Sequence, residues 1–204
     1  MHHPAFFDVA PRILVRDPLA ELLGAAEGGL LEYRYIDAVR LAGHSCPTVA
    51  GAWLTARAAL RALYPDEPAE RGGIAVRMPA PASEGVTGVI AQVLTLVTGA
   101  AADNGFHGIR GRYARYGLMH FADAPNGQPI RFDRRDNGTA VAVELDLASV
   151  PPARETLALM GAAMQPDATA AQRAAFGTAW QERVRRLLLE HADDPAVVRV
   201  RLLA

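Results

Sequence analysis

A histidine and the only cysteine of this 204-residue chain stand two positions apart in the segment Gly43-His44-Ser45-Cys46-Pro47. Apolar residues recur at helical spacing from Pro47 to Tyr64, so we expect a helix that begins at Pro47. Cys46 then lies at the helix start, where unpaired N–H groups and the helix dipole favour a thiolate. A thiolate is both a nucleophile and a metal ligand, and His44 offers a second ligand or a base. The alternative is a small buried cysteine that only packs.

The same segment resembles the Gly-His-x-Cys-Pro-x-x-x-x-Gly signature of the FmdE-like family, which is named after one component of formylmethanofuran dehydrogenase, although Gly51 comes one residue early. Two later segments, Thr95-Leu96-Val97-Thr98-Gly99 and Arg112 to Phe121, are similar to that family's helix end and following strand. The resemblance implies a metal-binding domain over residues 1–150, tied loosely to molybdenum or tungsten enzymes. Where the family has a second cysteine, this chain has Val86-Thr87-Gly88-Val89, and the family's Cys-rich zinc ribbon is absent.

The metal expected at this site is zinc, or else iron, bound by His44, Cys46 and His107. His107 lies in a Gly-rich loop whose backbone can approach a ligand closely. Water, His120 or a carboxylate such as Glu84 would complete the site. One cysteine cannot supply the several thiolates of a closed structural site, so we expect an open coordination position.

Other chemistries stay open. Cys46 could be the axial thiolate of a haem that lies against the small residues Ala50-Gly51-Ala52, with Gly51 as a cofactor-binding residue. A thiolate enzyme without metal lacks an identifiable acid to orient the Cys-His pair. Arginines at 110, 112 and 115 alternate with tyrosines, as in single-strand nucleic-acid binders, but a solvated strand edge explains them more simply. The same arginines suit ligand carboxylates or phosphates, and we expect Arg115 to bind such a cofactor.

Composition excludes several classes of function. The formal net charge is −1 and no run of 18 apolar residues occurs, so we expect neither nucleic-acid nor membrane binding. The chain has 21 arginines and no lysine, which excludes Schiff-base and P-loop-lysine chemistry. A single cysteine and the lack of a signal peptide indicate a cytoplasmic setting. Apolar surface on the helices near 86–97 and at the C-terminus predicts a homodimer, and a small-molecule ligand is a further expectation.

The helices and strands expected from the sequence together indicate an α+β fold, with a mixed or antiparallel sheet packed with helices. Residues 151–204 are expected to form a C-terminal helical extension packed on the same core. The predicted helices are a short one capped by Asp17 and longer ones over 47–64, 84–99, 153–160 and 168–191. The predicted strands cover 30–35, 73–78, 113–121, 128–132, 139–146 and 197–203. Asn126-Gly127 predicts a hairpin that joins the strands 113–121 and 128–132.

Overall fold

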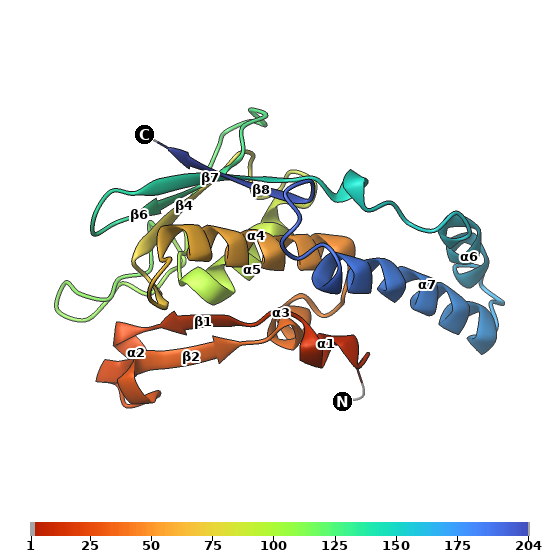
Figure 1. The fold of residues 1–204 in the computed structure, drawn as a ribbon, viewed down its shortest axis with the longest axis horizontal. Helices are drawn as coiled ribbons and strands as arrows, with labels where there is room; N and C mark the ends of the chain where they lie inside the picture. Colours follow the sequence, from red (N-terminus) through yellow and green to blue (C-terminus); the bar gives the residue numbers. More distant parts are fainter. Residues whose placement is uncertain (1–2, 204) are drawn as a thin grey trace.

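Two β-sheets enclose a pair of helices in this molecule (Figure 1). The structure is a computed structural model and describes residues 3–203. Helices pack on both a three-stranded and a five-stranded sheet, which confirms the expected α+β class with its mixed sheets and C-terminal helices. Among the described helices, none is both long enough and apolar enough to cross a membrane.

The elements follow the chain in a mixed order of helices and strands. The helices are α1 (Phe6–Val9), α2 (Pro18–Leu22), α3 (Tyr35–Ala42), α4 (Pro47–Leu63), α5 (Thr87–Thr98), α6 (Thr156–Ala163) and α7 (Ala170–Leu189), with short 3-10 turns at Glu27–Gly29 and Leu147–Ser149. The strands are β1 (Ile13–Arg16), β2 (Leu30–Tyr33), β3 (Ala69–Glu70), β4 (Ile74–Met78), β5 (Met119–Phe121), β6 (Ile130–Arg134), β7 (Ala140–Leu145) and β8 (Val198–Leu203).

The strand order explains how distant segments meet. In the smaller sheet, β1 pairs antiparallel with β2 and parallel with β3. The larger sheet has the order β5-β4-β6-β7-β8 and is antiparallel except between β4 and β5. Parallel neighbours need a long crossover, which α5 and the loop 99–118 supply. Because β4 lies between β5 and β6, the hairpin predicted around Asn126-Gly127 is wrong, and residues 113–118 belong to the loop rather than to a strand.

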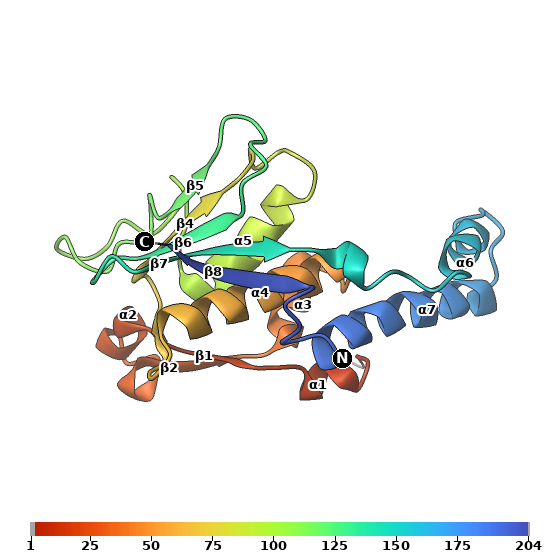
Figure 2. The same ribbon diagram turned by 45° about the horizontal axis from the view of Figure 1, so that its top comes forward.

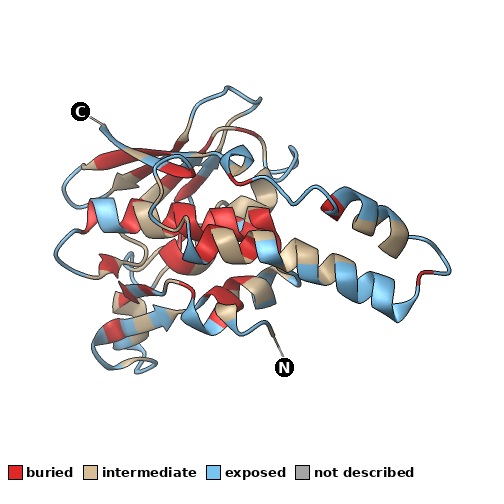
Figure 3. Ribbon diagram, turned by 45° about the vertical axis from the view of Figure 1, so that its right-hand side comes forward, coloured by how far each residue is buried: buried red, intermediate tan, exposed pale blue. Residues whose placement is uncertain are grey.

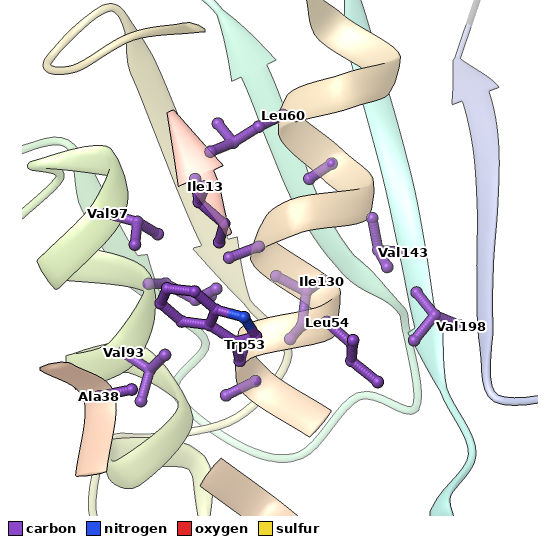
Figure 4. Packing of buried hydrophobic residues seen from close by; sticks show 14 of the residues in the cluster. Ile13, Ala38, Trp53, Leu54, Leu60, Val93, Val97, Ile130, Val143 and Val198 are labelled. Atoms are coloured by element: carbon purple, nitrogen blue, oxygen red, sulfur yellow. The ribbon is translucent and has the colours of Figure 1, made fainter. Parts of the chain in front are cut away.

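Helix α4 forms the centre of the core. Every residue from Val49 to Ala56 is buried (Figure 3), because one sheet lies on each side of the helix. Trp53 is fully buried near Val93 and Val97 of α5, while Leu54 points toward the larger sheet (Figure 4). The indole Nε1 of Trp53 donates to the carbonyl of Pro11 at 2.9 Å, so its polar atom is satisfied inside the core.

The C-terminal residues both extend from the core and return to it. Helix α6 packs against the first half of α7, and this hairpin projects from the body (Figure 1). The second half of α7 buries Val184, Leu187 and Leu188 against the body, and β8 completes the larger sheet. Leu157 of α6 stays 70% exposed. The homodimer remains a prediction.

Candidate functional site: a cysteine at a helix start and an arginine cavity

Cys46 lies at the position that the sequence predicts. It is the N-cap of α4, it is buried, and its Sγ accepts a hydrogen bond from the Val49 backbone N at 3.4 Å. The preceding carbonyl, that of Ser45, accepts from Trp180 Nε1 at 3.1 Å and from Gln181 Nε2 at 3.0 Å. Two side chains of α7 therefore fix the loop in which the cysteine stands.

Neither of the two histidines expected to join Cys46 makes a hydrogen bond to it within the described residues. His44 is exposed, and its Nδ1 bonds to the Ala42 carbonyl at 2.9 Å. His107 is also exposed, and its ring stacks on Tyr116 with 4.5 Å between centroids. The loop that carries His107 follows the C-terminal end of α5, at the end of the molecule where α4 finishes, whereas Cys46 begins α4 (Figures 1 and 2). The structure does not bring His107 to Cys46.

Gly51, expected beside a flat cofactor, faces the larger sheet. A Cβ at this position would lie 2.8 Å from Cδ2 of Leu145 and 3.1 Å from Cδ2 of Leu147. These leucines occupy the surface on which a planar group would lie. The glycine therefore allows a close approach of α4 to the end of the sheet.

Metal ligation by His44, Cys46 and His107 remains a prediction. No group of three or more His, Cys, Asp or Glu residues within 3–203 is arranged to hold a metal ion. If Cys46 is a ligand, we expect Cys46→Ser to keep the fold and to release most of the bound zinc or iron, since a neutral hydroxyl is a poor ligand. Elemental analysis of tag-free protein measures this. Equal metal content in wild type and variant would rule out the thiolate as a ligand.

An arginine-rich cavity of about 670 Å³ lies at the other end of the molecule. Its lining residues come from the end of β1, from α2, from β3 and the two residues after it, from the loop before β5, and from the residue after β6. Its lining consists of Arg16, Pro18, Glu21, Leu22, Glu70, Arg71, Gly72, Arg112, Tyr113, Ala114, Arg115 and Arg135. Five arginines against two glutamates make this wall strongly positive in a chain whose net charge is −1.

Asp17 organises the base of this cavity. It is 3% exposed, and its carboxylate meets Arg71 Nη1 at 2.9 Å and Arg115 Nη2 at 2.6 Å. It also caps α2 by accepting hydrogen bonds from the backbone N–H groups of Leu19 and Ala20. Burial raises the pKa of Asp17, but the two guanidinium groups and the two N–H donors outweigh this effect and hold the pKa below its ordinary value. Asp17 is therefore a buried anion that fixes two cations.

Arg115 is the most deeply buried of the lining arginines. Its Nη1 donates to the backbone carbonyl of Arg71, while its Nε has no partner within the described residues. Burial lowers the pKa of Arg115, and Asp17 offsets part of this effect. Gly72 has a φ of +88°, and a Cβ there would overlap with Arg115 Nη1. The side chain of Arg115 thus occupies space that only a glycine leaves free.

Two arginines of the lining have no counter-ion among the described residues. Arg112 lies over the ring of Tyr113, with its Cζ 5.1 Å from the centroid, and Arg135 donates to the Gly72 carbonyl at 3.1 Å. Neither has a carboxylate within ion-pair distance in the part of the chain that the structure describes. Tyr113 has a φ of +62°, and among residues 3–203 only Arg110 shares a positive φ outside glycine. Backbone strain of this kind concentrates at ligand-binding sites.

Sequence reasoning reached only part of this cavity. It selected Arg110, Arg112 and Arg115 as candidates for binding a carboxylate or phosphate, of which Arg110 is not part of the lining, and it assigned Asp17 only the role of a helix cap. The sequence patterns did not indicate a role for Arg71 or Arg135. No local signal could have joined these residues, because Asp17 lies 54 positions from Arg71 and 98 from Arg115. Comparison with known protein families and with curated proteins found no match to this chain.

Proposed function

We propose that this protein binds a small anionic molecule in the arginine cavity. The observation that carries the proposal is the pair Arg112 and Arg135, which line the cavity and have no carboxylate partner among residues 3–203. Unpaired guanidinium groups that line one cavity favour an anionic ligand, which accepts charge-assisted hydrogen bonds from them. We also propose that the protein acts in the cytoplasm, which is the setting expected from the sequence.

The other charges of the cavity support this assignment because they are already balanced. Arg16 pairs with Glu70 at 2.7 Å and approaches Glu21 at 3.7 Å. Arg71 and Arg115 share the single carboxylate of Asp17. These contacts hold the cavity wall in place before any ligand arrives, so little binding energy is lost in ordering it. The guanidinium groups of Arg112 and Arg135 therefore belong to a cavity whose wall is already ordered before the ligand binds.

We expect inorganic phosphate and malonate to raise the melting temperature of the wild-type protein more than chloride does at equal ionic strength. A ligand that binds only the folded state stabilises it in proportion to its occupancy. Arg112→Gln and Arg135→Gln should each weaken anion binding by roughly tenfold, because each removes one charge-assisted contact. Both side chains are exposed, so folding should be little affected.

Arg173→Gln is the matched control, since Arg173 is an exposed arginine on the projecting hairpin, far along the chain from the cavity. It should leave the anion effect unchanged. If phosphate and malonate stabilise all three variants as strongly as the wild type, the anions act elsewhere and the proposed function is wrong.

A further inference from the structure

We propose that the anion is a phosphate monoester that carries a partly apolar organic group. This inference rests on the proposed function and specifies its ligand. It depends on three features of the cavity: the number of unpaired charges, the volume, and the apolar residues beside the arginines.

The charge balance favours a dianion. Among the charged residues of the lining, Glu21, Glu70 and the underlying Asp17 balance three arginines, which leaves two guanidinium groups over. A phosphate monoester carries a charge of about −1.5 to −2 at neutral pH and offers three acceptor oxygens. It therefore carries enough charge and enough acceptor oxygens for two guanidinium groups, and Arg112 and Arg135 both line this cavity. A phosphate diester or a single carboxylate carries only one charge and would leave one guanidinium uncompensated.

The size of the cavity calls for more than the phosphate itself. A volume of about 670 Å³ is in the range that holds a whole organic ligand, roughly 300–1,000 Å³. Pro18 and Leu22 of α2 form one part of the lining, and Leu22 is 55% exposed. Tyr113 adds an aromatic ring beside Arg112. An organic group on the phosphate would cover this apolar surface, while the arginines bind its charged end.

The decisive comparison pairs ligands that differ in charge and share their organic part. Adenosine 5′-monophosphate is a monoester and its 3′,5′-cyclic form is a diester with one charge less. We expect the monoester to bind at least about tenfold more tightly at pH 8 in calorimetric titrations. Phenyl phosphate tests the same charge on a non-nucleotide group, and binding of phenyl phosphate but not the nucleotide would assign the organic part to a smaller, non-nucleoside molecule.

Two further arms complete the test. Monoester affinity should fall as the pH is lowered from 8 to 5, because the phosphate takes up its second proton near pH 6 while the arginines stay charged. Leu22→Asn should weaken phenyl phosphate severalfold and leave inorganic phosphate unchanged. If phthalate, an aromatic dicarboxylate, binds at Arg112 and Arg135 but the monoesters do not, the phosphate assignment is overturned and anion binding stands. If no anion binds, both proposals fail.

Discussion

Replacement of Asp17 by asparagine should cost about 3–5 kcal/mol of unfolding free energy, the typical effect of removing one partner from a buried ion pair. Asparagine is as good a helix N-cap as aspartate, so the cap of α2 is retained and the loss reports the charge. Arg71 and Arg115 would keep their positive charges in a site where Asp17 is only 3% exposed. Urea-induced unfolding, followed by the tryptophan fluorescence of Trp53 and Trp180, measures this free energy.

Glu182→Gln is the control for this experiment, because Glu182 pairs with Arg185 on the surface, where its side chain is 50% exposed. Breaking such a pair should change stability by less than about 1 kcal/mol. If Asp17→Asn costs no more than Glu182→Gln, the buried network does not hold the base of the cavity.

The same variant should change the acid limb of the stability profile. The pKa of Asp17 lies below its ordinary value of 3.8 in the folded protein, so its contribution is complete above that value. The contribution is lost as the pH falls further, through the lower pKa of the folded state. The gap in unfolding free energy between wild type and Asp17→Asn should therefore narrow below about pH 4.

A methyl group at Gly72 should lower the unfolding free energy by nearly as much as the replacement of Asp17. We expect Gly72→Ala to cost at least about 3 kcal/mol, since it combines an unfavourable positive φ with displacement of Arg115 from its carboxylate. The methyl carbon would overlap with Arg115 Nη1, and this side chain is only 8% exposed. Because Asp17 and the Arg71 carbonyl both hold its guanidinium, Arg115 cannot move without losing them.

Gly138→Ala separates the two contributions. Gly138 has a φ of +76°, and a Cβ there would meet no atom of residues 3–203 within 4 Å. This variant should cost only about 1–2 kcal/mol, the effect of the backbone conformation alone. Similar losses of unfolding free energy for both variants would show that Arg115 adapts easily and that the cavity base is not tightly packed. A larger loss at Gly72, together with weaker anion binding, is the expected result.

Local patterns predicted much of the fold. Pro47 after Cys46 marked the start of α4, and Gly99 marked the end of α5, where its φ is +73°. The strands predicted over 73–78, 139–146 and 197–203 match β4, β7 and β8 within a residue or two. The boundaries of these elements are determined by a few adjacent residues, so they can be predicted from the local sequence. The short strands β1 and β3 have no such boundaries, and β3 pairs with β1, more than 50 residues earlier in the chain.

Local sequence patterns could not predict which distant segments of the chain lie side by side. Asn126-Gly127 favours a turn between adjacent strands, but the whole segment 122–129 separates Phe121 from Ile130, and β4 occupies the place beside β6. The cavity could not be predicted for the same reason, since its arginines come from separate segments of the chain. Arg115 could be selected from its neighbours in the sequence. Its partner Asp17 could not, because the local role of that residue as a helix cap already explains its presence.

Calorimetric titration of phenyl phosphate at pH 8 into wild-type protein and the double variant Arg112→Gln/Arg135→Gln tests the anion site most directly. Both proteins must first show the same unfolding free energy, so that only the two guanidinium groups differ. We expect one binding site per wild-type chain and an affinity lowered by roughly 100-fold or more in the double variant. Equal affinities for the two proteins would contradict an anion site in the arginine cavity, and no binding to the wild type would contradict the phosphate monoester proposed as its ligand.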